Sequence, residues 1–120
     1  MLTKNKEYKF YQIINELRNI YLQDGSKKLY QDNNWCVYSQ LDNVELKSNC
    51  YIDEYPEIDD TSFEEKSPSF IEERELQLIF RDELLQDVIV STLSRKENAS
   101  NEELLESIHY YDDNDTFLEL

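Results

Sequence analysis

The stretch Trp35–Asp53, WCVYSQLDNVELKSNCYID, decides the fold class of this chain. Its two ends, Trp35–Gln40 and Ser48–Asp53, are short segments rich in aromatic and β-branched residues, and Asp and Asn residues bound them. That composition is typical of β-strands. We therefore predict two strands that form a hairpin through the turn Asp42-Asn43-Val44.

The register of this hairpin predicts where the two cysteines lie. If the strands pair symmetrically about Asn43, Cys36 lies opposite Cys50. The N-terminal segment has neither a continuous apolar run nor a small-residue cleavage site, so we expect no signal peptide and a cytoplasmic protein. In that compartment two facing cysteines are expected to be reduced, buried thiols rather than a disulfide.

A helix is predicted on the N-terminal side of the strands, from about Glu7 to Leu22. Its apolar residues recur at intervals of three and four, which indicates one buried face: Phe10, Ile13, Ile14, Leu17 and Tyr21. Gly25 follows and suits a left-handed helix cap, so we expect the helix to end there.

A third strand and two more helices are predicted on the C-terminal side. Ser69–Phe80 returns to ordered structure, with a strand in which Leu76, Leu78 and Phe80 alternate with Gln77 and Ile79. A helix is expected over Asp82–Lys96, with Asp82 as its N-cap. Another is expected from Ser100 to about Tyr111. Its first residues, Ser-Asn-Glu-Glu, form a capping box.

The order of these elements predicts an α+β fold in one domain spanning residues 1–120. We expect the order α-β-β-loop-β-α-α, with a small, mostly antiparallel sheet packed against about three helices. Asp112–Asp115 is expected to end the last helix, and Thr116–Leu120 is a short apolar tail that suits an edge strand.

The acidic residues are distributed unevenly along the chain. Residues 1–40 carry six Lys or Arg and four Asp or Glu, whereas residues 41–120 carry six Lys or Arg and 23 Asp or Glu. The net charge of the whole chain is −15. So much negative charge repels nucleic acid and anionic membranes and attracts basic partners. We therefore expect no direct nucleic-acid partner and no membrane partner.

The segment Glu54–Pro68, EYPEIDDTSFEEKSP, is the candidate binding site and is expected to be a long acidic loop. The alternative interpretation is that this acidic run is only a solvated surface, which keeps the protein in solution and binds no partner. Aromatic and aliphatic residues among the carboxylates, including Ile58 and Phe63, favour a binding surface. The predicted partner-binding residues are Asp53, Glu54, Tyr55, Glu57, Asp59, Asp60, Glu64 and Glu65.

The sequence offers little that suggests catalysis or a cofactor. Gly25 is the only glycine, which excludes glycine-rich phosphate-binding loops, and His109 is the only histidine. The cluster Asp112, Asp113 and Asp115 lacks the glycine and final glutamate of a calcium-binding EF-hand loop. We therefore expect neither an enzyme nor a metal site, and no cofactor.

Several segments resemble a family of small uncharacterised bacterial domains, some of them encoded near polymorphic toxin genes. The likeness is strongest over Leu85–Phe117, in the runs Leu-Gln-Asp-Val-Ile, Ala-Ser-Asn-Glu-Glu-Leu-Leu and Tyr-Tyr-Asp-Asp-Asn-Asp-Thr-Phe. It is looser over Gln31–Phe70, and it carries over no catalytic residue. In size and acidity the chain is also similar to immunity proteins of contact-dependent growth inhibition systems.

These features lead to three hypotheses about function, of which a small hydrolase or metal-dependent enzyme is the least favoured. The first is an immunity protein that binds and neutralises a cognate toxin domain, expected to be a basic nuclease, through the acidic segment. The alternative is a phage-type mimic of nucleic acid, which inhibits several nucleic-acid-binding proteins because its carboxylates are spaced like phosphates. The sequence does not fix the oligomeric state, nor whether Asp112, Asp113 and Asp115 join the binding surface.

Overall fold

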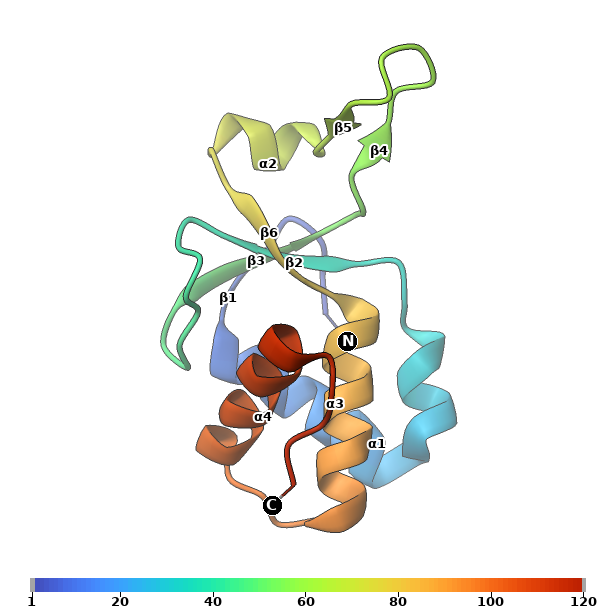
Figure 1. The fold of residues 1–120 in the computed structure, drawn as a ribbon, viewed down its shortest axis with the longest axis vertical. Coiled ribbons are helices and arrows are strands. Elements are labelled where there is room, and N and C mark those ends of the chain that lie inside the picture. Colours follow the sequence, from blue (N-terminus) through green and yellow to red (C-terminus); the bar gives the residue numbers. More distant parts are fainter. Residues whose placement is uncertain (1, 120) are drawn as a thin grey trace.

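A four-stranded antiparallel sheet divides the protein into two layers (Figure 1). The computed structural model describes residues 2–119. The strands lie in the order β1-β3-β2-β6, and their bounds are β1 (Glu7–Lys9), β2 (Cys36–Ser39), β3 (Asn49–Asp53) and β6 (Gln77–Arg81). The predicted α+β fold with an antiparallel sheet is confirmed.

Three helices cover one face of the sheet, and a smaller layer covers the other (Figure 1). The three are α1 (Phe10–Gln31), α3 (Asp82–Arg95) and α4 (Asn101–Asn114). The smaller layer holds the short helix α2 (Ser69–Glu73) and a separate two-stranded sheet of β4 (Glu57–Ile58) and β5 (Glu65–Lys66). No helix within residues 2–119 is long and apolar enough to cross a membrane.

The main core lies between the three helices and the sheet. It contains the predicted apolar face of α1, including Phe10 and Leu17, together with buried residues of α3 and α4 such as Ile89 and Leu104. The rings of Phe10 and Phe80 stack with their centroids 5.6 Å apart, which ties α1 to β6. Each such fully buried side chain contributes roughly 1.5–3 kcal/mol of hydrophobic stabilisation.

The N-terminal helix begins three residues later than the sequence predicts. Glu7–Lys9 forms β1, which pairs with β3, and α1 begins only at Phe10. The Oε1 atom of Gln12 accepts a hydrogen bond from the backbone N–H of Lys9 at 2.8 Å and so caps the helix. Pairing with a strand about 40 residues away along the chain is a tertiary contact that helical periodicity does not reveal.

Gly25 has the predicted positive φ, but the chain does not leave the helix there. With φ 86° and ψ 176°, the glycine kinks α1, and a second helical segment runs on to Gln31. The continuation is stabilised by Leu29, which is fully buried in the main core. The predicted end of the helix is therefore a bend within it.

Replacement of Gly25 by alanine is expected to lower the free energy of unfolding by about 1–3 kcal/mol, because this backbone conformation is nearly restricted to glycine. No atom lies within 4 Å of an added Cβ, so the loss comes from the backbone alone. Denaturant unfolding measures it, with the exposed helical residue Gln23, changed to alanine, as the control. A stability of Gly25→Ala equal to that of the control would contradict the assignment.

The predicted register of β2 and β3 is wrong, and the two cysteines do not face each other. Cys36 pairs with Asp53, whereas Cys50 pairs with Tyr8 of β1. The register differs from the prediction by three residues, and an odd shift moves side chains to the opposite face. Cys36 therefore lies in the smaller layer and Cys50 in the main core.

The connection between β2 and β3 explains the difference in register. It is not a tight turn centred on Asn43, because Val44 is fully buried in the main core. The carbonyl oxygen of Val44 lies 2.8 Å from Nε2 of His109 in α4. Ser48 closes a separate turn with Glu45. The backbone N–H of Ser48 donates to the carbonyl of Glu45 at 3.1 Å, and the hydroxyl oxygen of Ser48 accepts from the N–H of Glu45 at 2.8 Å. His109 thus has a structural contact that joins α4 to this connection.

Both thiols are expected to resist a disulfide-exchange reagent in the native protein. Cys36 and Cys50 are fully buried, and burial raises the pKa of each thiol to about 12, so little reactive thiolate forms near pH 8. Without denaturant we expect no fast reaction of either thiol. In denaturant we expect both thiols to react. Rapid native reaction of either thiol would contradict their burial.

The same thiols predict a loss of stability at alkaline pH. Their folded-state pKa of about 12 lies above the ordinary value of 9.0, so the native state holds protons that the unfolded chain releases. This contribution is complete below pH 9.0 and is lost as the pH rises towards about 12. Urea titrations from pH 8 upward should show a shallower decline for a Cys36→Ala, Cys50→Ala variant. An equal decline would contradict the prediction.

The predicted third strand is present as β6, with a β-bulge that the sequence does not reveal. Val37 pairs with Phe80 and Tyr38 with Leu78, which leaves Ile79 as the extra residue. The bulge turns Phe80 into the main core, while Leu76 and Leu78 contact the smaller layer. The simple alternation of the prediction therefore places Phe80 on the wrong face.

The two C-terminal helices agree closely with the sequence. The capping box of α4 is confirmed, with Ser100 and Glu103 each bonding the other's backbone N–H. The helix ends three residues later than predicted, at Asn114, with Asp115 in the left-handed conformation. Residues 116–119 form no strand, contrary to the prediction, and Leu120 lies outside the described residues. Phe117 instead packs on the ring of Tyr111, with centroids 4.7 Å apart.

Candidate functional site

The acidic segment is a projecting β-hairpin rather than the expected loop (Figure 1). Glu57 pairs with Lys66 and Ile58 with Glu65. We call residues 57–66 the acidic hairpin. It lies at one end of the molecule's 45 Å long axis, beyond the face of the sheet that α2 covers. The prediction missed it because each strand has only two residues, too few to show a period.

Backbone hydrogen bonds hold the tip of the acidic hairpin in a fixed shape. The N–H of Asp59 donates to the carbonyl of Glu64 at 2.9 Å, and the N–H of Phe63 donates to the carbonyl of Asp59 at 2.8 Å. Oδ1 of Asp59 accepts from the N–H groups of Thr61 and Ser62 at 2.8 and 2.9 Å. The N–H groups of Ser62 and Thr61 hold the pKa of the Asp59 carboxyl below its ordinary value. Asp59 therefore shapes the tip.

Phe63 is the most distinctive residue of the tip. Its side chain is 80% exposed, and its φ of 59° lies in the left-handed region. Both features are unfavourable for a phenylalanine, and the backbone conformation alone costs roughly 1–2 kcal/mol. Ile58, also on the hairpin, is 64% exposed. A rigidly presented, exposed aromatic side chain has the character of an interface anchor.

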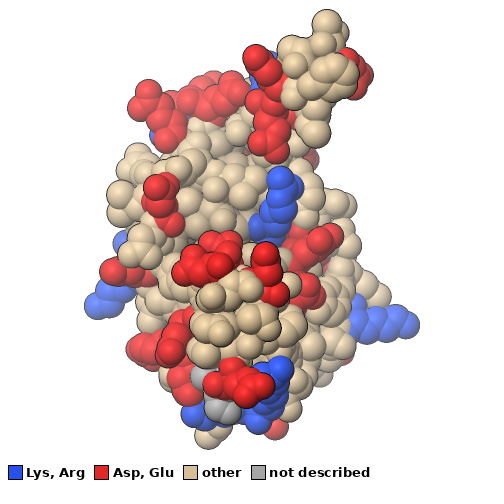
Figure 2. Space-filling model, in the orientation of Figure 1, with Lys and Arg blue, Asp and Glu red and all other residues tan. Residues whose placement is uncertain are grey.

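Carboxylates surround these apolar residues. Glu57, Asp60 and Glu64 are exposed, and within residues 2–119 none of the three forms an ion pair. Glu65 differs, since it lies 3.6 Å from Arg81 of β6. Figure 2 shows carboxylates along the hairpin and α2, with uncharged atoms at the end of the hairpin. The tip thus combines an apolar centre with a negative rim.

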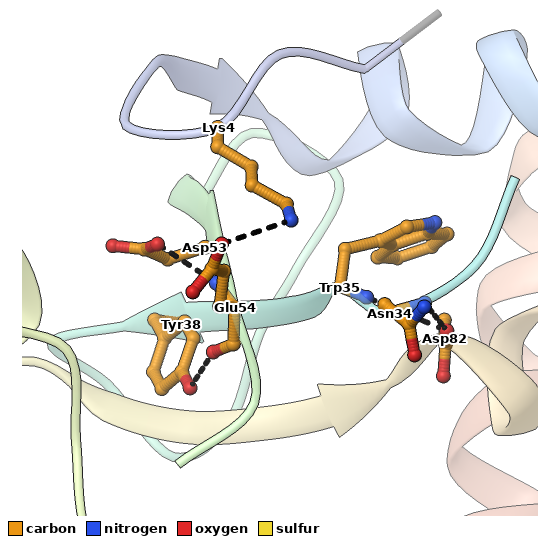
Figure 3. A network of polar contacts seen from close by, with 7 residues as sticks. All are labelled: Lys4, Asn34, Trp35, Tyr38, Asp53, Glu54 and Asp82. Carbon is orange, nitrogen blue, oxygen red and sulfur yellow. Dashed lines mark hydrogen bonds and ion pairs between the residues drawn. The ribbon is translucent and has the colours of Figure 1, made fainter. Parts of the chain in front are cut away.

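Asp53 and Glu54 belong to the base of the hairpin (Figure 3). Asp53 is only 5% exposed, and its Oδ1 accepts from the N–H of Glu54 at 2.7 Å. Its Oδ2 is buried without a hydrogen-bond partner in the described part of the chain. Glu54 pairs with Lys4 at 3.5 Å, and its carbonyl accepts from the hydroxyl of Tyr38 at 2.6 Å. Asp53 is thus too buried to meet a partner.

Tyr55 joins the base of the hairpin to the beginning of α3. Its hydroxyl donates a hydrogen bond to Asp82, and burial, followed by that bond, raises the pKa of the Tyr55 hydroxyl. The other oxygen of Asp82 accepts from the N–H of Asn34 at 2.6 Å and, more weakly, from that of Trp35 at 3.4 Å (Figure 3). Asp82 is 1% exposed, so it acts as an internal acceptor for three segments.

The prediction that Asp82 is the N-cap of α3 is wrong by one residue. Arg81 occupies the N-cap position of α3, and Asp82 is the first helical residue. The carboxylate of Asp82 still accepts from a first-turn N–H, that of Glu83, at 2.8 Å. Its contacts to Asn34 and Tyr55 are tertiary, and no local pattern around Asp82 indicates them.

Helix α2 supports the other end of the hairpin. Pro68 precedes α2, and Phe70 packs on Tyr51 of β3 with ring centroids 5.7 Å apart. The guanidinium of Arg74 lies 3.7 Å from the centre of the Phe70 ring. Ile71 is fully buried in the smaller layer with Cys36 and Tyr38. Both ends of the acidic hairpin are therefore attached to packed structure.

The structure separates the predicted binding residues into two groups. Five lie on the acidic hairpin: Glu57, Asp59, Asp60, Glu64 and Glu65. The other three, Asp53, Glu54 and Tyr55, form its base. The C-terminal Asp112, Asp113 and Asp115 lie at the end of α4, on the other side of the sheet from the hairpin (Figure 1). Ile58 and Phe63 were missing from the predicted set, although apolar residues inside an acidic turn were the available signal.

The carboxylates of the site do not converge on a point. Within residues 2–119, no three His, Cys, Asp or Glu side chains lie close enough together to hold one metal ion. The nearest groove, of about 350 Å³, lies between the hairpin and α2, with Glu54, Glu57 and Lys66 among its lining residues. The arrangement suits a surface contact with another macromolecule.

Comparison with known proteins gives one family. Residues 14–120 match the family described as a domain of unknown function (DUF7716). No curated protein and no solved structure matches the chain. The matched range includes the acidic hairpin, α2 and the whole of the helical layer after the first turn of α1, so the candidate site lies inside the family's domain.

Proposed function

The chain belongs to the DUF7716 family, and we propose that it is an immunity protein, which binds a basic toxin domain through the acidic hairpin and neutralises it. The partner class is a cognate toxin domain with a basic cleft, such as a nuclease. The observation that carries the proposal is Phe63, held exposed at a positive φ beside carboxylates that form no ion pair within residues 2–119.

The chemistry of the tip assigns different tasks to its residues. Glu57, Asp60 and Glu64 attract a basic surface over a distance set by the ionic strength and so accelerate encounter. Phe63 and Ile58 then lose water on contact, and buried aromatic anchors supply most of the affinity in protein interfaces. Such a two-part site suits an inhibitor that must find its target quickly and release it slowly.

The apolar tip favours a protein partner over mimicry of nucleic acid. A mimic presents carboxylates in rows like phosphates, and an exposed phenylalanine between the two strands of a projecting hairpin has no counterpart in such a row. The carboxylates here surround an apolar centre instead. Nucleic-acid mimicry is therefore the competing hypothesis, which the capture experiment described next distinguishes from immunity.

The test is capture of partners from the native host by the immobilised chain at low salt, with elution by a salt gradient and identification by mass spectrometry. We expect one basic partner, released only at high salt, and earlier release of the same partner from a Phe63→Ala bait. Leu41→Ala, which removes another exposed apolar side chain on a different segment, is the matched control. Many nucleic-acid-binding proteins leaving together at modest salt, with no effect of Phe63→Ala, would contradict the proposal.

A further inference from the structure

Strand β6 forms an open edge of the main sheet, remote from the tip of the acidic hairpin. It pairs with β2 on one side, and among residues 2–119 no strand pairs with its other side. A groove of about 390 Å³ lies against it and is lined by four consecutive residues of β6, Leu78–Arg81. The opposite wall comes from the beginning of α3 and the end of α4. An open strand edge along a groove has the geometry that accepts an added strand.

The walls of this groove are apolar and acidic. Leu84 of α3 and Tyr111 of α4 are partly buried apolar residues along it. Glu83, Asp87 and Asp112 add carboxylates. Burial, followed by the neighbouring charge of Asp113, raises the pKa of the Asp112 carboxyl. A cation placed beside Asp112 would favour its charged form, so the groove is suited to basic side chains.

We propose that this groove binds an extended segment of a partner protein, with alternating basic and apolar residues, which adds to β6 as a further strand. Backbone hydrogen bonds to the open edge would supply affinity. Alternate side chains of an added strand point to opposite faces of the sheet, so the basic ones would all lie on the face of α3 and α4 and meet Glu83, Asp87 and Asp112. The apolar ones would lie on the face of the smaller layer, beside Leu78. This surface touches the acidic hairpin only through the ion pair of Arg81 with Glu65, and the proposal stands even if the tip of the hairpin binds nothing.

Charge decides between a foreign segment and a second copy of this chain. Two copies joined edge to edge through β6 would bring together the same carboxylates, Glu83 and Asp87, and like charges placed opposite each other are destabilising. The only basic residue of β6, Arg81, is engaged with Glu65 and lies over the ring of Tyr55 at 5.1 Å. A basic partner meets no such repulsion. The bulge at Ile79 limits the added strand to a short one.

The test uses the full chain and a probe peptide, acetyl-Lys-Val-Lys-Val-Lys-Val-Lys-amide. Binding is followed by amide NMR shifts and by hydrogen exchange of the backbone. We expect the largest changes at residues 77–81, with slower exchange there. A second peptide with every internal backbone nitrogen methylated keeps the charge and side chains but cannot donate to the edge, and it should bind at least tenfold more weakly.

A matched pair of protein variants locates the contact. Leu84→Lys places a positive charge in the groove and is expected to weaken peptide binding about tenfold, while Leu22→Lys, at an exposed position on α1, should change it less than twofold. Melting curves show whether each variant is folded. Equal binding of the methylated peptide, or shifts confined to residues 57–66, would overturn the proposal. A concentration-dependent dimer joined through β6 would overturn the choice of a foreign segment.

Discussion

Replacement of Asp82 by alanine is expected to lower the free energy of unfolding by about 3 kcal/mol. The carboxylate accepts hydrogen bonds from the backbone N–H of Asn34, the backbone N–H of Trp35 and the hydroxyl of Tyr55. A buried donor left without an acceptor costs about 1–3 kcal/mol, and solvent reaching the partly exposed donors reduces the total. Urea unfolding of the purified chain measures the loss.

Two further variants separate the parts of this contact. Tyr55→Phe removes one donor together with its need for an acceptor, so we expect a smaller loss, about 1 kcal/mol. Asp87→Ala also removes a carboxylate from α3 that accepts from a tyrosine hydroxyl, that of Tyr30 at 2.7 Å, but at an exposed contact. It serves as the control and should cost less than Asp82→Ala. A loss below 1 kcal/mol for Asp82→Ala would show that this carboxylate is not an internal anchor.

Reversal of three hairpin charges is expected to slow association with the partner about 10- to 100-fold at low salt. The substitutions are Glu57→Lys, Asp60→Lys and Glu64→Lys, at exposed positions that form no ion pair in the described part of the chain. Electrostatic attraction acts mainly before contact, so the association rate should change far more than the dissociation rate. Stopped-flow kinetics at several salt concentrations measure both. Asp59 is left unchanged because its carboxylate holds the tip.

The control for this prediction reverses the same number of charges elsewhere. The control uses three exposed residues, Glu97, Glu102 and Glu106. The first two lie at the connection from α3 to α4, at the opposite end of the long axis (Figure 1), and Glu106 lies further along α4. Their change to lysine alters the net charge equally but leaves the hairpin intact. Equal slowing by both variants would mean that total charge, rather than the hairpin, drives association. Unchanged rates with the hairpin variant would exclude the hairpin as the encounter surface.

Much of the fold could be predicted because its elements carry repeated local signals. The apolar residues of α1, such as Phe10 and Leu17, recur at helical intervals and indicate a helix however it packs. The capping box at Ser100 is likewise local in sequence. Strand β1 and the register of β2 against β3 depend on contacts between distant residues. The burial of Val44 sets that register, and no local pattern shows it.

The candidate site shows the same division. Composition alone indicated the acidic segment, and five of its carboxylates do lie on the hairpin. Tyr55 could not be recognised as an anchor, because its acceptor Asp82 lies 27 residues further along the chain. Phe63 could not be recognised as strained, because a positive φ for phenylalanine is set by the hydrogen bonds of the tip rather than by its own preference.

The most direct test of the account is backbone hydrogen exchange of the chain, alone and bound to the partner captured from its host. The central claim is that the acidic hairpin is the contact surface. It predicts that binding slows exchange at residues 57–66, with Phe63 and its neighbours most protected, and leaves the connection between α3 and α4 unchanged. Unaltered exchange across residues 57–66 in a saturated complex would contradict the claim.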